Sequence, residues 1–172
     1  AIAACYERMA IAKKTRSSVF AVLRDVSKAF DKVWTEGLKY KILQLDLPAQ
    51  VERVLCSYLD DRRAQVCWDS RSSDTIPLLA GVPQGGVLSP TLYNIYVRDA
   101  PLAEPGSQNL CYADDVTQLV VADTANIRNA MVDLRIAVGA QNEFEHKWKI
   151  KTNMRKFKIV PIAKVASKMP PL

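Results

Sequence analysis

Two adjacent carboxylates, Asp114 and Asp115, lie between two apolar runs, 109–112 and 116–121, that each have the length of a β-strand. This pattern predicts a β-hairpin with the acidic pair at its tip. Crowded like charges are costly unless a cation accompanies them, and hard carboxylate oxygens suit Mg²⁺. Because Asp is also common in ordinary turns, the pair taken alone is equally compatible with a turn that has no metal role.

A third carboxylate, Asp25, follows the apolar run Val19–Leu23, which is typical of a buried strand. Active-site groups of open α/β sheets tend to lie at the C-terminal ends of strands. If the strand of Asp25 neighbours the hairpin, Asp25 meets Asp114 and Asp115, and three carboxylates can hold two Mg²⁺ ions about 4 Å apart. Two-metal sites of this kind serve in-line displacement at phosphorus, so the pattern favours phosphoryl or nucleotidyl transfer.

The composition argues against several other classes of site. The chain has 172 residues, 49% of them hydrophobic, which allows one domain, or a domain and a fragment, with a substantial core. His146 is the only histidine, so a His-based metal site or a Ser-His-Asp triad is not expected. The four cysteines are widely separated and predict reduced core thiols rather than disulfides or zinc ligands. No apolar run approaches the roughly 20 residues that span a membrane.

The net charge of +6 is concentrated near the C-terminus. Residues 147–172 carry eight Lys or Arg and no Asp or Glu, whereas the remaining residues carry 16 basic and 18 acidic side chains. A basic segment of this kind binds nucleic-acid phosphates, or it is a solvated basic tail, and the composition alone leaves both interpretations open.

Hydrophobic periodicity and turn signals predict the elements that position these residues. Helices are expected over 1–15, 38–45, 49–59, 89–99 and 124–146, the fourth with Ser89 as its N-cap. Strands are expected over 19–23, 64–68, 75–80, 109–112, 116–121, 148–151 and 157–162. The glycine- and proline-rich run 81–86 predicts a tight, defined loop.

Three motifs in this order resemble those of a known family. The runs Asp-Val-Ser-Lys-Ala-Phe-Asp (25–31), Gly-Val-Pro-Gln-Gly (81–85) and Tyr-Ala-Asp-Asp (112–115) resemble palm motifs A, B and C of reverse transcriptases. The residues around them, such as 29–34 and 88–96, resemble non-LTR (LINE-type) retrotransposons of the jockey-like group. The resemblance covers roughly residues 18–162. The last of these motifs alone is a modest signal, whereas all three in order and with suitable spacing are very specific.

The resemblance implies an α+β fold, the polymerase palm-like antiparallel sheet with helices packed on one face. It divides the chain into a remnant of the fingers with the first palm strand (1–24), the palm with motifs A to D (25–162) and a basic tail (163–172). Only 24 residues precede Asp25 and there is no initiator Met. We therefore expect a piece of a longer protein, with the fingers truncated and the thumb and endonuclease regions absent.

The resemblance also assigns chemistry to individual residues. Asp25, Asp114 and Asp115 are implied to bind two Mg²⁺ ions, for which Mn²⁺ can substitute, with the backbone carbonyl of Val26 as a further ligand. Lys156 resembles the motif D lysine that protonates the pyrophosphate leaving group, as a lysine tuned by its surroundings can do. Several lysines neighbour it, so this assignment stays open between them.

Four further residues are implied to contact the substrates. Phe30 matches the aromatic position that stacks under the incoming sugar and disfavours ribonucleotides, or it is a core residue. Gln84 and Gly85 match the loop that contacts the incoming nucleotide and the template, or they only form a turn. Tyr112 is implied to touch the primer end, although it could simply pack.

The function that follows is RNA-directed DNA polymerisation, in which a dNTP is added to the 3′-OH of a DNA primer on an RNA template. The resemblance implies a ribonucleoprotein of the nucleus and cytoplasm, with no membrane partner, acting with the remaining regions of its parent polyprotein. The alternatives are a decayed or domesticated fragment that binds nucleic acid without catalysis, an intron-maturase or retron relative, and a small structural domain.

Three residues depart from the family pattern: Gly86 stands where Ser is usual, Thr35 replaces a common His, and Arg24 is the third. Arg24 occupies a position that is usually apolar, and strand alternation turns it away from the face of Asp25. An unpaired buried charge there would destabilise the fold, so Arg24 must reach a partner or solvent, or this copy has decayed.

Overall fold

The computed structural model describes residues 3, 6, 7, 10, 11, 14, 17–101, 108–112, 115–122 and 127–163. These residues divide into two compact units. The first contains the described residues of 1–27 and 100–172, and the second contains residues 28–99. Within the described part of the chain, no helix combines the length and the apolar character needed to cross a membrane.

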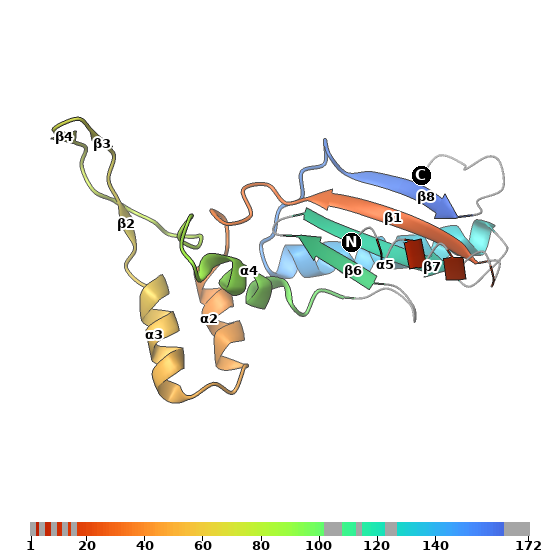
Figure 1. Cartoon of the computed structure of the whole chain (residues 1–172), viewed down its shortest axis with the longest axis horizontal. Coiled ribbons are helices and arrows are strands. Elements are labelled where there is room, and N and C mark those ends of the chain that lie inside the picture. The colour runs from red at the N-terminus through yellow and green to blue at the C-terminus, as the bar shows by residue number, and fades with distance from the viewer. Residues whose placement is uncertain are drawn as a thin grey trace. The chain divides into compact units, whose positions relative to one another are not determined.

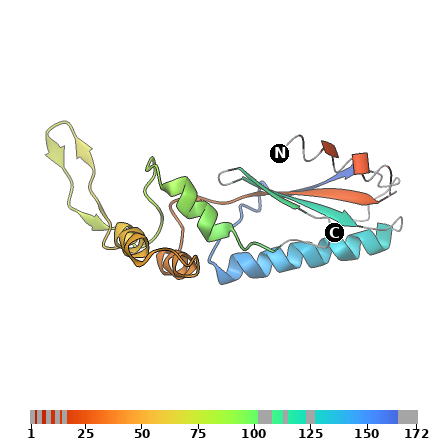
Figure 2. The same cartoon turned by 60° about the horizontal axis from the view of Figure 1, so that its bottom comes forward.

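The first unit contains a four-stranded antiparallel sheet in the order β6-β7-β1-β8 (Figure 1). Its strands are β1 (Ser18–Asp25), β6 (Gln108–Tyr112), β7 (Asp115–Ala122) and β8 (Lys158–Ala163). Helix α5 (Ile127–Lys147) runs along one face of this sheet (Figure 2). The predicted strand at 19–23, the hairpin, the long helix and the last strand are thus confirmed, and the unit has the expected α+β character.

The core of the first unit lies between α5 and the sheet. Phe20 and Val22 alternate along β1 and are fully buried, as is Val120 on β7. Helix α5 contributes Met131 and Leu134 at the spacing of one helical face. Each fully buried side chain of this kind stabilises the fold by about 1.5–3 kcal/mol relative to an exposed one. Strand β1, paired on both edges, is therefore held firmly, and Asp25 stands at its end.

The second unit is built from three helices and a long hairpin. The elements are α2 (Thr35–Leu43), α3 (Ala49–Leu59), α4 (Ser89–Val97) and the short strands β2 (Arg63–Ala64), β3 (Cys67–Trp68), β4 (Arg71–Ser72) and β5 (Ile76–Pro77). The helices pack through α2, which contacts both α3 and α4. Buried apolar side chains from these helices form the core: Leu38, Ile42, Leu59, Leu92, Tyr93 and Tyr96.

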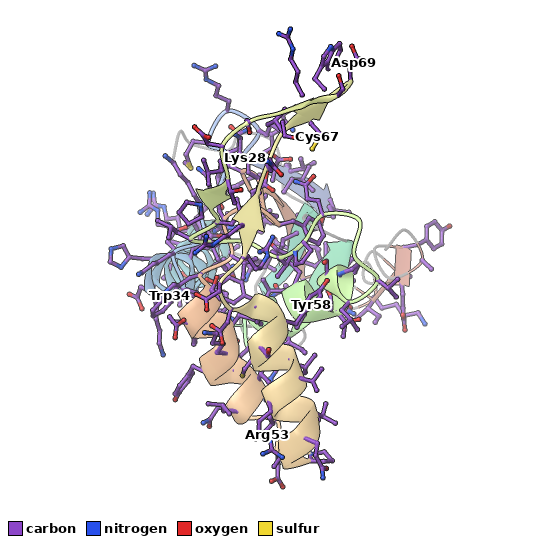
Figure 3. All side chains as sticks on the ribbon, turned by 90° about the vertical axis from the view of Figure 1, so that its left-hand side faces the viewer. Lys28, Trp34, Arg53, Tyr58, Cys67 and Asp69 are labelled. Carbon is purple, nitrogen blue, oxygen red and sulfur yellow. The ribbon has the colours of Figure 1, made fainter. Side chains whose placement is uncertain are left out.

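The hairpin of the second unit is less regular than predicted. Instead of two strands over 64–68 and 75–80, there are two short pairs, β2 with β5 and β3 with β4. The side chains from 65 to 80 are exposed, so this segment buries no apolar face that would hold long strands in register. Cys67 and Asp69 lie at the end of the hairpin (Figure 3), where Asp69 turns the chain with a φ of 50°.

Two local predictions were wrong. Ser89 is the first helical residue of α4 rather than its N-cap, which is Leu88, and the Ser89 hydroxyl donates to the carbonyl of Pro83. Residues 148–151 do not form a strand, because α5 ends there in a left-handed turn at Lys149 (φ 54°). The amide of Ile150 donates to the Glu145 carbonyl (2.8 Å) and that of Lys149 to His146 (3.3 Å), the pattern of a Schellman cap.

Candidate active site

The backbone places Asp25 beside the acidic motif. Asp25 is the last residue of β1 and lies directly opposite Asp115, the first residue of β7, which in turn pairs with Tyr112 on β6. Directly opposite residues of an antiparallel pair have Cα atoms about 4.5–5.5 Å apart. Asp114 lies outside the described residues, and only the backbone of Asp115 and Tyr112 is described. The strand register therefore brings the backbone of Asp25 beside that of Asp115, and the convergence of the three carboxylates stays a prediction.

The carboxylate of Asp25 is held by a turn that follows α5. Lys156 Nζ donates to Asp25 Oδ1 (3.0 Å) and Asn153 Nδ2 donates to Asp25 Oδ2 (3.3 Å). The Asn153 amide also donates to the backbone carbonyl of Asp25 (2.8 Å). The structure thus brings the predicted Lys156 to the predicted Asp25. The adjacent Val26 is buried and pairs with Thr152.

Asn153 is a contact that sequence reasoning missed. Its side-chain Oδ1 accepts a hydrogen bond from the Arg155 amide (3.2 Å), and its carbonyl accepts one from the Lys156 amide (2.9 Å). This is an Asx-type turn, in which Asn organises the two or three residues that follow it. The Asn-Met-Arg-Lys run was the signal that could have identified Asn153 as the residue that presents Lys156.

A pocket of about 480 Å³ opens beside Asp25. Its lining residues come from β1, β7 and the segment after α5: Leu23, Arg24, Asp25, Val116, Thr117, Arg155, Lys156 and Lys158. Arg155, Lys156 and Lys158 are exposed cations near the Asp25 carboxylate, whereas Arg24 is buried. Lys and Arg side chains bind phosphate oxygens through charge-assisted hydrogen bonds, so the pocket suits a phosphate-bearing ligand that brings a cation to Asp25.

The residues present are compatible with a divalent cation. The Asp25 side chain retains 22% exposure, and a carboxylate that accepts one hydrogen bond on each oxygen still has lone pairs available for a metal. Its partner position across the strand pair is another aspartate, Asp115. Within the described ranges no three His, Cys, Asp or Glu side chains form a metal-binding group, and Asp114 lies outside those ranges.

Arg24 has found a buried partner on the opposite face of β1. Its Nη1 donates to Glu145 Oε1 (3.0 Å) and to Asn142 Oδ1 (3.0 Å), and its Nη2 donates to the Val138 carbonyl (3.4 Å). Arg24 and Glu145 are 4% and 8% exposed. Burial lowers the pKa of Arg24 from its ordinary value, while the charge and hydrogen bond of Glu145 oppose that shift. Arg24, one of the residues that depart from the family pattern, is thus paired with Glu145.

In the second unit, three predicted substrate-contacting residues line one pocket. Phe30, Gln84 and Gly85 surround about 500 Å³, together with Gly86, Ser89 and Pro90. Phe30 is half-buried and its ring lies 5.2 Å from that of Tyr93, so one part of it packs while the other faces the pocket. Gln84 Nε2 donates to Asp31 Oδ1 (2.6 Å), which gives Asp31 a partner.

Backbone contacts hold the loop of Gln84 against the turn that carries Phe30. The Val82 amide donates to the Phe30 carbonyl (2.7 Å) and the Gly81 amide to the Val33 carbonyl (2.8 Å). Gly81 has a φ of 92°, and a Cβ at this position would lie 2.8 Å from the carbonyl oxygens of Phe30 and Asp31. Only glycine permits this close approach, which explains why the run at 81–85 begins with it.

Comparisons with known proteins agree with this arrangement. Residues 2–166 match the model of the family described as reverse transcriptase (RNA-dependent DNA polymerase). The chain is 34% identical over 139 residues to the RNA-directed DNA polymerase from mobile element jockey of Drosophila melanogaster, covering 77% of this chain and 15% of that protein. It is 43% identical over 115 residues to a probable RNA-directed DNA polymerase from transposon BS of the same species, covering 62% and 12%.

The fold agrees as well. The apo telomerase of Candida tropicalis, truncated from its C-terminal domain, superposes with a TM-score of 0.68 over 97% of this chain and 35% of its own, at 18% identity. The chain spans about 15% of the jockey protein's length. From the family match and the jockey similarity together, the chain belongs to the reverse transcriptase (RNA-dependent DNA polymerase) family, as a domain of the non-LTR, jockey-like kind.

Proposed function

We propose that this chain supplies the catalytic palm of an RNA-directed DNA polymerase, with Asp25, Asp114 and Asp115 as its metal-binding carboxylates. The observation that carries the proposal is the strand register, which sets Asp25 opposite Asp115 at the end of the hairpin. Two Mg²⁺ ions, or Mn²⁺ in their place, would be held by the three carboxylates and the Val26 carbonyl. When bound, such ions activate a hydroxyl and neutralise charge that develops on phosphate oxygens.

The reaction is a displacement at the α-phosphorus of a dNTP. The 3′-oxygen of the primer forms a bond to that phosphorus and loses its proton to solvent water, and the bond to the bridging oxygen breaks, which releases pyrophosphate. Lys156 would give a proton to the leaving pyrophosphate. Its Nζ lies 3.0 Å from Asp25, on the edge of the basic pocket that also contains Arg155 and Lys158.

Residues of the second unit would recognise the nucleotide and the template. The exposed part of Phe30 would stack under the deoxyribose and clash with a 2′-hydroxyl. Gln84 and Gly85 would contact the incoming nucleotide and the template base, since they share a pocket with Phe30. Tyr112, beside Asp115 in the strand register, would touch the primer end.

The partners follow from this chemistry: an RNA template, a DNA primer and a dNTP, together with fingers, thumb and endonuclease regions of a parent polyprotein. In terms of the family's architecture, residues 25–162 would form the palm with motifs A to D, residues 1–24 would supply its first strand and part of the fingers, and residues 163–172 would add a basic tail. The protein would act as a ribonucleoprotein in the cytoplasm and nucleus.

The test is primer extension by the complete protein as its gene encodes it. An oligo-dT primer on poly-rA is supplied with dTTP and Mg²⁺, then Mn²⁺, beside an Asp114→Asn/Asp115→Asn variant. We expect extension by the natural protein and none by the variant. Extension that survives in the variant would contradict the carboxylate assignment. Binding of poly-rA without any extension would favour a domesticated or decayed protein that only binds nucleic acid.

A further inference from the structure

Arg24 and Asp25 are adjacent on β1 and contact the same turn from the two faces of the sheet. On one face, the Asp25 carboxylate accepts hydrogen bonds from Asn153 and Lys156. On the other, Arg24 pairs with Glu145. The turn between residues 152 and 157 is therefore contacted by Arg24 and Glu145 on one face of the sheet and by Asp25 on the other.

Glu145 is hydrogen-bonded to the first residue of this turn, Thr152. Its Oε1 accepts from Arg24 (3.0 Å) and from Gln141 (3.4 Å), while its Oε2 accepts from Thr152 Oγ1 (2.6 Å). Its backbone carbonyl accepts the Ile150 amide (2.8 Å) in the cap that ends α5. Glu145 thus takes part in the cap through its backbone, and its side chain holds Thr152, the residue that joins the sheet beside Val26.

Arg24 contacts the last residue of the turn, Phe157. Its guanidinium lies over the ring of Phe157, 5.2 Å from the centroid, at the residue that follows Lys156. The Phe157 amide in turn donates to the Asn153 carbonyl (3.1 Å). The Arg24–Glu145 pair therefore contacts residues on both sides of Asn153 and Lys156, but neither of those residues directly.

We propose that Glu145 and Arg24 are positioning residues that set Asn153 and Lys156 against the Asp25 carboxylate. This inference rests on the proposed function in one respect, since its catalytic consequence requires nucleotidyl transfer at Asp25. Buried ion pairs contribute little net stability compared with apolar side chains of similar volume, so stability alone does not explain this pair. Its contacts instead converge on the turn that supplies two hydrogen bonds to the carboxylate.

The first test measures the geometry without activity, by amide hydrogen exchange in the complete protein. Glu145→Gln should speed exchange of the Asn153 and Lys156 amides about 10-fold, the effect of losing one charge-assisted hydrogen bond. Amides in the apolar part of β1 and β7, such as Val120, should keep their rates. Glu143→Gln, the same change at an exposed position of α5, should alter neither set. Unchanged rates at Asn153 in Glu145→Gln would overturn the inference.

The second test uses Thr152, which can be changed without leaving a buried charge unpaired. Thr152→Val removes the hydroxyl that reaches Glu145, and Thr152→Ser keeps it. In primer extension we expect Thr152→Val to lower kcat about 10-fold, as loss of a supporting contact does, with KM for dTTP unchanged within about 2-fold. Thr152→Ser should retain the natural kcat. Equal kcat values in all three proteins would overturn the catalytic part of the inference.

A double change separates positioning from general damage. In a Lys156→Ala background, Thr152→Val should lower kcat by a smaller factor than it does alone. Lys156 is one of the two residues that the contact positions, and it is already missing there. Full additivity would overturn the inference. If the natural protein extends no primer at all, the proposed function fails, and the exchange rates of Asn153 and Lys156 still decide whether Glu145 positions the turn.

Discussion

The two ends of the interface between α5 and the sheet are built from opposite chemistry. At one end, Phe20 and Val22 of β1 pack against Leu134 and its apolar neighbours on α5. At the other end, the same alternation along β1 brings Arg24 onto Glu145. Both ends are buried, yet one is apolar and the other is ionic and hydrogen-bonded.

This difference separates stability from positioning within a single interface. Apolar burial stabilises the fold, but the hydrophobic effect itself has no preferred direction. A buried ion pair contributes less net stability, but its hydrogen bonds have defined lengths and directions. The polar end contacts the turn that carries Asn153 and Lys156, so it supports the site. The apolar end holds the helix and the sheet together.

The largest expected effect is at the apolar end. Leu134→Ala removes a fully buried side chain and should lower the free energy of unfolding by about 2–5 kcal/mol. Urea-induced unfolding of the variant measures this change. A loss below about 1 kcal/mol would show that this end does not dominate the stability of the unit.

At the polar end, Asp25→Asn should act on the reaction rather than on the fold. Losing this charge should lower kcat about 10²–10³-fold, equivalent to roughly 3–4 kcal/mol of transition-state stabilisation. Because the side chain is partly exposed and its ion pair with the exposed Lys156 is weak, the free energy of unfolding should change by less than about 1 kcal/mol. A kcat within a factor of two of the natural value would exclude Asp25 as a metal-binding residue.

Gln118 tests where the apolar end of the interface stops and the polar end begins. It lies on β7 opposite Val22, is 1% exposed, and neither atom of its amide has a hydrogen-bond partner among the described residues. Gln118→Leu should therefore raise the free energy of unfolding by about 1–3 kcal/mol, the usual penalty of an unsatisfied buried polar group. If thermal unfolding shows that Gln118→Leu lowers the free energy of unfolding instead, Gln118 is part of the polar end.

The smallest effect is expected on the face of α5 that points away from the sheet. Val132 is 53% exposed, so Val132→Ala should change the free energy of unfolding by no more than about 0.5 kcal/mol. The same urea titration used for Leu134→Ala provides the comparison. Equal losses at both positions would mean that α5 does not use one face for the core.

The sequence predicted the parts of this arrangement that depend on local pattern. The alternation around Val22, the hairpin ending at Asp115 and the periodicity of α5 are local signals, and the structure confirms those elements. Phe30, in one motif, and Gln84 and Gly85, in another, were each implied to contact the substrates, and they line one pocket. Their roles, like those of the aspartates, remain predictions.

The missed features depend on contacts that are distant along the chain. The partner of Arg24 is 121 residues away at Glu145, so periodicity could show that Arg24 faces the helix but not which residue meets it. The false strand at 148–151 arose because its apolar residues fit a strand pattern, whereas Trp148 packs on Phe144 and Lys149 takes the left-handed conformation that ends α5. Cap geometry at a non-glycine residue leaves little trace in a sequence.

The most direct test of the difference between the two ends replaces the ion pair by apolar side chains in Arg24→Met/Glu145→Leu. Both the free energy of unfolding and kcat of primer extension are measured, beside the exposed control Arg135→Met/Glu143→Leu on α5. We expect the free energy of unfolding to stay the same or rise by about 1–4 kcal/mol while kcat falls about 10-fold. A natural kcat in the double variant, or a loss of stability as large as that of Leu134→Ala, would contradict a positioning role for the polar end.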